Sequence, residues 1–193
     1  MATSPKNGKL LYHFTALSNL EAILSYGLIS RENVKTFDDV ADNKIIEHRQ
    51  SIGLNNYVPF HFFAGTPFDG SVQCSFPEKA FVYITIQRSF AEKNSFLVLK
   101  RHPLSMPECM PLSYLQGMKE IDWEIMKERN YNDHDCKEVC MAECISPQTI
   151  APESFFNIYT KTEEVKAKVV SLRDRIVGST SFFVDVNSSF FVK

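Results

Sequence analysis

The stretch Leu11-Tyr12-His13-Phe14-Thr15 opens the part of the chain from which the fold is best derived. Tyr12 and Phe14 alternate with His13 and Thr15, so an apolar face and a face carrying His13 and Thr15 can lie on opposite sides of a β-strand. The strand therefore presents an imidazole and a hydroxyl group near its end. A short strand of this kind, followed at once by a helix, is one way of building a ligand site.

A helix is expected next, within the segment from Ala16 to Leu28, because apolar residues recur there at helical spacing. Ser18 and Glu21 have the spacing of a capping box, which favours a helix start at this point. Gly27 stands where a residue with a left-handed backbone is expected to end the helix.

The length and amino-acid composition are those of an ordered protein. The chain has 193 residues, of which 44% are hydrophobic and 16 are Phe, and this composition favours a strand-rich folded chain over a disordered one. The length suits one domain over residues 1–193, with residues 1–9 as a flexible terminus. The sequence has no run of 18 apolar residues and no signal-peptide core near its start, so we expect a soluble cytoplasmic protein without membrane contact.

The net charge of −2 gives no support to nucleic-acid binding by bulk electrostatics. Local basic clusters are still possible, and one of them contains Arg88, Lys93, Lys100 and Arg101. The charge balance therefore leaves the nature of the partner open.

Five cysteines are present, and Cys136, Cys140 and Cys144 are spaced four residues apart. This spacing is compatible with a metal site on one helical face, but the sequence has no CxxC pair and no histidine at zinc-finger spacing. The odd count also argues against a disulfide framework. Ordinary reduced cysteines are the favoured interpretation, and no metal is expected.

The remaining elements suggest an α+β fold, because strands do not alternate regularly with helices. Residues 64–70, rich in Gly and Pro, are expected to form turns. Further strands are predicted at 57–63, 80–86, 96–99, 139–145, 155–159, 182–186 and 190–192, and helices at 42–50, 114–130 and 161–176.

Chemistry is expected from polar residues embedded in apolar segments, since no P-loop, GxGxxG, HExxH or GxSxG motif is present. Burying an ionised carboxylate is costly, so Glu143 in its apolar surroundings is paired, protonated or facing a cleft. Taken singly, His13 suits a structural histidine as well as a functional one, and Arg49 suits a solvated loop residue.

Three blocks of the sequence together resemble the DarT-type DNA ADP-ribosyltransferase toxins. The blocks follow the family's order and span the chain from about residue 10 to its end. The matching segments are Tyr12-His13-Phe14-Thr15 with Asn19-Leu20 and Gly27-Leu28, then Arg49 with Tyr57-Val58-Pro59-Phe60 and Thr66-Pro67-Phe68, and finally Ala142-Glu143 with Ile145 and Phe155 to Tyr159.

The resemblance implies a split β-sandwich of two small antiparallel sheets with flanking helices, and NAD bound in the cleft between them. It further implies NAD-dependent mono-ADP-ribosylation of a base in single-stranded DNA, without a metal. The context implied is a toxin–antitoxin or antiphage system, in which a macrodomain ADP-ribosylglycohydrolase antitoxin reverses the modification.

The resemblance also assigns roles to residues of this chain. Glu143 would be the catalytic carboxylate, Arg49 would contact phosphates or the reacting nucleotide, and residues 29–48 would cover NAD. Other cofactor contacts are expected from His13, Thr15, Asn19, Gly27, Leu28 and Tyr57. Substrate DNA is expected to meet Trp123, Arg129, Tyr131 and His134.

Departures from the family pattern leave part of the function open. Many relatives follow the Val-Pro-Phe block with a Tyr and an Arg-Ser-Pro-Met-type sequence, whereas this chain has His61 and then residues 64–70. Thymine and guanine are therefore both possible target bases. Transfer to RNA or protein, and a non-catalytic nucleotide-binding domain, are the alternative functions, because one fold hosts several activities.

Overall fold

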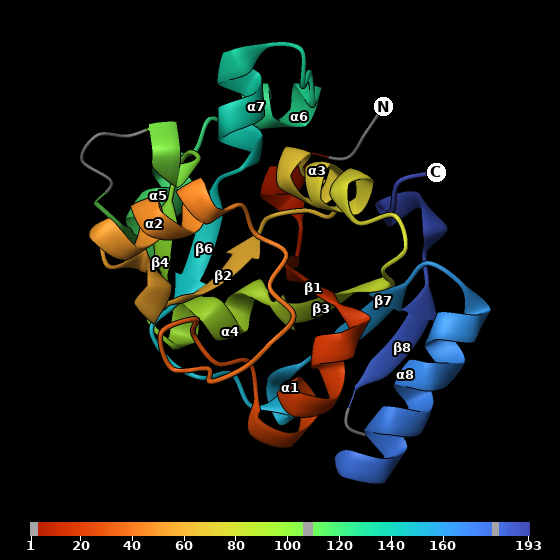
Figure 1. The fold of residues 1–193 in the computed structure, drawn as a ribbon. Coiled ribbons are helices and arrows are strands. Elements are labelled where there is room, and N and C mark those ends of the chain that lie inside the picture. The colour runs from red at the N-terminus through yellow and green to blue at the C-terminus, as the bar shows by residue number, and fades with distance from the viewer. Residues whose placement is uncertain (1–3, 106–109, 179–181) are drawn as a thin grey trace.

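The structure is a computed structural model, and it describes residues 4–105, 110–178 and 182–193 (Figure 1). These residues form the expected α+β fold. The strands are β1 (Leu10–Ala16), β2 (Val58–His61), β3 (Phe81–Gln87), β4 (Leu97–Leu99), β5 (Leu112–Ser113), β6 (Glu143–Ser146), β7 (Asn157–Thr160) and β8 (Phe183–Val186). The helices are α1 (Leu20–Tyr26), α2 (Asn43–Ser51), α3 (Pro67–Ser75), α4 (Arg88–Lys93), α5 (Tyr114–Glu120), α6 (Trp123–Glu128), α7 (His134–Cys140) and α8 (Glu163–Ile176).

The strands join into one hydrogen-bonded sheet with the order β5-β4-β6-β2-β1-β3-β7-β8. Neighbouring strands are antiparallel except β7 and β8, which are parallel. The two four-stranded halves meet only at the pair Tyr12↔His61 between β1 and β2. The expected pair of small sheets is therefore present as two halves of one sheet that are joined at a single point.

The local sequence explains why β1 and β2 separate after this point. If the pairing continued, Phe14 would lie opposite Pro59, and proline has no N–H group to donate to a neighbouring strand. The ladder ends there, and the His13 side chain donates a hydrogen bond from Nδ1 to the Pro59 carbonyl oxygen at 2.8 Å instead. This side-chain bond holds the edges of the opening together.

Helices cover the sheet on both sides of the opening. In Figure 1, α8 lies beside β8 and packs against α1, while α2 and α5 lie near β4 and β6. The main apolar core runs through both halves of the sheet and includes the fully buried Leu11, Phe60 and Ile84. Among the described residues, no helix is both long and apolar enough to cross a bilayer.

Several predicted elements differ from the structure, and the helix predicted at 114–130 is divided into α5 and α6. Residues 64–70 do not form turns alone, because α3 begins at Pro67 with a capping box in which Thr66 and Asp69 bond each other's backbone. The predicted strand at 139–145 begins only at Glu143, because the apolar residues before it belong to α7 and form its buried face. The C-terminal segment 190–192 is also not a strand in the structure.

The predicted cap of the first helix is wrong in one respect. A short 3-10 turn, Leu17–Asn19, precedes α1, and the Ser18 hydroxyl donates a hydrogen bond to the Asp38 carboxylate at 2.8 Å instead of capping the helix. At the other end Gly27 has a φ of +88°, as expected for a positive-φ cap. A Cβ atom at Gly27 would lie 2.8 Å from the Ile150 carbonyl oxygen, so glycine also permits the close approach of these two segments.

Candidate active site

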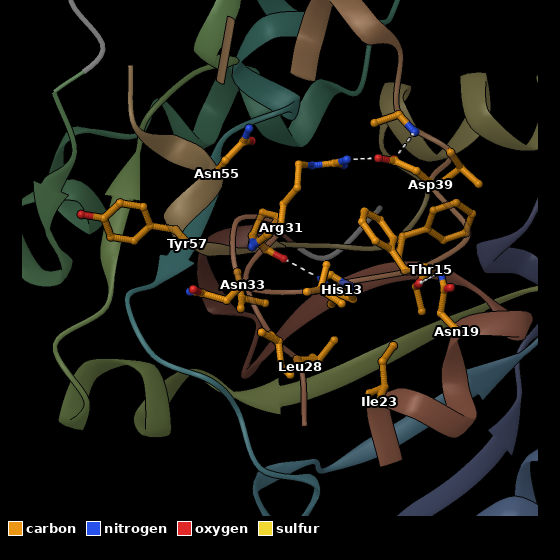
Figure 2. A pocket seen from close by; sticks show the side chains of 18 of the residues that line it. His13, Thr15, Asn19, Ile23, Leu28, Arg31, Asn33, Asp39, Asn55 and Tyr57 are labelled. Atoms are coloured by element: carbon orange, nitrogen blue, oxygen red, sulfur yellow. Dashed lines mark hydrogen bonds and ion pairs between the residues drawn. The ribbon is translucent and has the colours of Figure 1, made fainter. Parts of the chain in front are cut away.

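A cavity of about 690 Å³ lies where β1 and β2 separate. Its walls come from the end of β1, α1, the loop between α1 and α2, the start of β2 and the first residue of β6. Figure 2 shows His13 and Thr15 beneath the loop residues Arg31 and Asp39, with Asn55 and Tyr57 at one side. The volume falls within the range of about 300–1,000 Å³ that is typical of sites for cofactors and other small molecules.

His13 is a neutral hydrogen-bond acceptor toward this cavity. Its Nδ1 faces the Pro59 carbonyl oxygen and must therefore carry the proton, which leaves the lone pair on Nε2. Burial lowers the pKa of His13 to about 4, so the ring is uncharged at neutral pH. A neutral Nε2 can accept a hydrogen bond from a ribose hydroxyl group.

Arg49 and Glu143 form a buried ion pair across the cavity, although 94 residues separate them in the sequence. Arg49 Nη1 lies 2.7 Å from Glu143 Oε1 and 2.8 Å from Oε2. The two side chains are only 11% and 7% exposed. The sequence suggested a solvated loop for Arg49 taken alone, whereas helix α2 directs it inward to meet the carboxylate at the start of β6.

The loop after α1 is fastened over the cavity at Asp38. The Asp38 backbone N–H donates to Asn19 Oδ1 at 2.7 Å, and Asn19 Nδ2 donates to the Asp38 carbonyl oxygen at 3.0 Å. The Asp38 carboxylate also forms an ion pair with Lys79, besides its bond from Ser18. Asn19 Nδ2 lies 3.2 Å from Thr15 Oγ1, so these contacts connect the loop to β1.

A second arginine reaches the cavity from this loop. Arg31 forms an ion pair with Asp39 and lies over the Phe37 ring, with the guanidinium carbon 5.1 Å from the ring centre. Burial and the charge of Arg49 lower the pKa of Arg31, and both arginines line the cavity. Two such groups beside one cavity suit a pyrophosphate.

The structure brings together all eight residues predicted for catalysis and cofactor contact. They line the one cavity although they come from three distant segments of the chain. These residues are His13, Thr15, Asn19, Gly27, Leu28, Arg49, Tyr57 and Glu143.

The four residues predicted to contact DNA do not line this cavity. Trp123 is 5% exposed, donates from its indole N–H to the Met118 carbonyl oxygen and packs edge-on against Phe62. It belongs to the core, and its burial leaves no ring face for a base to stack on.

The other three residues lie at or near the surface. Arg129 extends over the Phe63 ring, Tyr131 donates to the Gly65 carbonyl oxygen at 3.0 Å, and exposed His134 faces Glu138. Contact with DNA remains a prediction for Arg129, Tyr131 and His134.

Sequence reasoning missed several cavity residues, among them Asn55, His61, Phe68 and His102. His61 looked structural because it stands among phenylalanines. The available signal was alternation along β2, which puts His61 on the same face as Pro59. Phe68 lies in the segment for which turns were predicted, and no sequence pattern pointed to His102.

The cysteines give no sign of a metal site in the part of the chain that the structure describes. Cys136, Cys140 and Cys144 are buried, and no group of three or more His, Cys, Asp or Glu side chains is arranged to hold an ion among the described residues. Cys136 and Cys140 direct their thiols to backbone carbonyl oxygens of Ile125 and Met126. Burial raises the pKa of Cys140 to about 12, so its thiol stays protonated.

Similar solved structures confirm the fold. A DarT from Thermus sp. 2.9 in complex with ADP-ribosylated ssDNA has a TM-score of 0.86 and 17% identity, with 100% of each chain covered. The same protein in complex with NAD+ has a TM-score of 0.78 and 16% identity, over 96% of this chain and 98% of that one. A DarTG from Thermosipho africanus in complex with ADP-ribose has a TM-score of 0.70 and 20% identity, over 95% of this chain and 51% of that one.

Sequence comparison identifies the family. No curated protein matches the chain in sequence. The model of one family matches residues 12–191, which include every residue of the cavity and all of the strands except the first two residues of β1. The chain therefore belongs to the DarT family of ssDNA thymidine ADP-ribosyltransferases, and it is an ADP-ribosyltransferase of single-stranded DNA.

Proposed function

We propose that the cavity binds NAD, that Glu143 and Arg49 carry the catalytic charges, and that thymine is the base modified. The observation that carries this proposal is the buried Arg49–Glu143 pair in a cavity that also holds His13, Thr15 and Asn19. The family name supports thymine over guanine, which the sequence alone left open.

The cavity fits NAD in three respects. Its volume is adequate, two arginines line it and can meet a pyrophosphate, and His13 offers a neutral acceptor for a ribose hydroxyl. Asn55 also lines the cavity, and among the described residues its buried Oδ1 has no hydrogen-bond partner. An unpaired buried acceptor is costly, so a ligand donor would relieve it.

NAD supplies the ADP-ribosyl group through a nicotinamide–ribose bond whose cleavage leaves positive charge on the ribose carbon. The Glu143 carboxylate can stabilise that charge, because it lies in a buried site where electrostatic interactions are strong. Arg49 holds both carboxylate oxygens and so fixes their orientation. Arg31 and loop residues 33–41 line the cavity, where they can shield the reacting groups from water.

Mass spectrometry of nucleosides tests this proposal. Single-stranded DNA treated with the protein and NAD should yield ADP-ribosylated thymidine. Glu143→Gln, which keeps the shape but removes the charge, should lower the yield at least about a hundredfold. Glu120→Gln is the matched control, because Glu120 lies on the surface in a pair with Lys100 and outside the cavity.

Three outcomes would contradict parts of the proposal. Full transfer by Glu143→Gln would remove Glu143 from the mechanism. ADP-ribosylated guanosine would correct the base, and product found on RNA or protein but not on DNA would correct the acceptor.

We also propose that a macrodomain ADP-ribosylglycohydrolase is the antitoxin partner. The support is that this chain covers 51% of the Thermosipho DarTG, so that protein contains a further part of similar length. Adding such a hydrolase to the modified DNA should restore unmodified thymidine. A modification that withstands every macrodomain tested would argue against this partner.

A further inference from the structure

His61 stands beside the proposed catalytic carboxylate. It pairs directly with Glu143 across β2 and β6, so the two side chains leave the same face of the sheet with Cβ atoms about 5 Å apart. Both residues line the cavity. The mechanism described above gives His61 no task, although it is the nearest titratable neighbour of Glu143 in the strand register.

The ring of His61 is held in one orientation. Nδ1 lies 3.1 Å from the Ala142 carbonyl oxygen, and only a protonated Nδ1 can donate to that acceptor. The ring also packs against Phe68, with centroids 6.3 Å apart. In the neutral ring the lone pair is therefore on Nε2, and within the described residues Nε2 has no hydrogen-bond partner.

The other titratable groups near Glu143 are Arg49, His13 and His102, which also lines the cavity. Both oxygens of Glu143 accept from Arg49 Nη1. His13 directs its own Nδ1 to Pro59, on the far side of the β1–β2 contact. His61 is the one of these groups that is paired with Glu143 across neighbouring strands and has an available lone pair on a ring held by a hydrogen bond. Imidazole is the side chain most often used for proton transfer near neutral pH.

We propose that His61 Nε2 receives the proton of the acceptor base during transfer. This step rests on the proposed function of the cavity. For thymidine the only N–H group is N3–H. As the bond from N3 to the ribose C1 forms, the bond from that carbon to nicotinamide breaks, and its electron pair leaves on the nicotinamide nitrogen. The N3 proton passes to His61 Nε2, and the imidazolium then releases it to water.

Two substitutions separate this role from the structural role of Nδ1. In His61→Asn the amide nitrogen occupies the place of Nδ1 and can still donate to Ala142, but no atom replaces Nε2. In His61→Ala both the donor at the Nδ1 position and Nε2 are lost. The rate of transfer at saturating NAD is measured for both variants together with the dissociation constant for NAD and the thermal midpoint.

We expect His61→Asn and His61→Ala to lose transfer to a similar extent, about a hundredfold or more, with NAD affinity within about threefold of wild type. Added imidazole should restore part of the activity of His61→Ala. If His61→Asn keeps the wild-type rate while His61→Ala does not, Nδ1 and not Nε2 matters, and the proposal is overturned. Loss of NAD affinity that accounts for the whole loss of rate would also overturn it.

Failure of the proposed function gives a different result. If the wild-type protein modifies RNA or protein, or only hydrolyses NAD with water as the acceptor, the assignment of thymine is wrong. The ratio of the transfer rate of His61→Asn to that of wild type, measured on that acceptor, still decides the role of His61 where the nucleophile is an N–H or O–H group, because such a group gives up a proton.

Discussion

At the scale of single residues, His13 combines a structural contact with a functional one. Its Nδ1 bonds the Pro59 carbonyl at the point where the β1–β2 ladder ends, and its other nitrogen belongs to the cavity wall. Taken singly in the sequence, His13 suited a structural histidine as well as a functional one, and its place in the structure is compatible with both interpretations. One ring nitrogen holds the opening between the strands, and the other is left for a ligand.

The depressed pKa of His13 predicts acid sensitivity. The ordinary value of 6.5 falls to about 4 on folding, so between these pH values the unfolded chain binds more protons than the folded one. The free energy of unfolding should therefore decrease as the pH falls from 6.5 to 4, by up to about 3 kcal/mol from this residue. Above pH 6.5 this contribution is fully present.

Urea denaturation at pH 7 and at pH 4.5 measures this effect against His13→Asn. The asparagine amide can still donate to Pro59 but does not titrate. We expect the variant to lose less stability than wild type between the two pH values. Equal losses would show that acid sensitivity arises at other groups.

At the scale of elements, the loop between α1 and α2 depends on a few side chains for its position. Asn19 uses its whole amide group on Asp38 and Thr15. It therefore acts on the loop that lines the cavity, and its effect on NAD would be exerted through that loop. The orange trace in Figure 1 shows this loop crossing the face of the molecule between α1 and α2.

Asn19→Ala should loosen this loop. Two hydrogen bonds to the Asp38 backbone are lost, each worth about 1 kcal/mol, so we expect the KM for NAD to rise about tenfold or more with a smaller change in kcat. Hydrogen exchange at residues 33–41 should quicken. Ser18→Ala, which removes one exposed bond to the same aspartate, is the matched control and should give a weaker effect. Unchanged exchange in Asn19→Ala would contradict the idea of a fastened loop.

Elements were predictable where a single periodicity governs the side chains. β1 and β3 alternate or are strongly apolar, and the structure has both. The region from Val139 to Ile145 fits a helix as well as a strand, and only packing assigns its first part to α7 and its end to β6. In the sequence alone, Pro67 indicates a turn. In the structure Pro67 lies in the first turn of helix α3, where proline is tolerated.

At the scale of the whole molecule, sequence reasoning placed the three segments of the cavity because the family blocks carry them. It did not place their contacts. The Arg49–Glu143 pair joins residues 94 positions apart, and the Asp38 contacts depend on an irregular loop with no periodicity. His61 became visible only from the register of β2 against β6. Long-range pairings of this kind are set by tertiary packing, which no local pattern encodes.

The two halves of the sheet also depend on a second connection, at Arg88 in α4. The sequence grouped Arg88 with a possible basic patch, but it is 6% exposed and makes four hydrogen bonds to backbone carbonyl oxygens. The acceptors are Leu10 in β1, Phe62 just after β2, and Lys6 and Pro5 in the N-terminal segment. The guanidinium group thus joins both sides of the β1–β2 opening, where the strands themselves share one residue pair.

Replacing Arg88 should therefore weaken the whole fold. Arg88→Met fills the space but leaves four backbone carbonyl groups without their donor, two of them in buried hydrogen bonds, and we expect the free energy of unfolding to fall by at least about 3 kcal/mol. Arg88→Lys keeps the charge, but a compact ammonium group cannot match the forked geometry of guanidinium, so it should recover less than half of the loss. Urea denaturation followed by circular dichroism measures both variants, with Arg175→Met, an exposed surface arginine, as the control. Full stability of Arg88→Lys would mean that charge alone holds the two halves together.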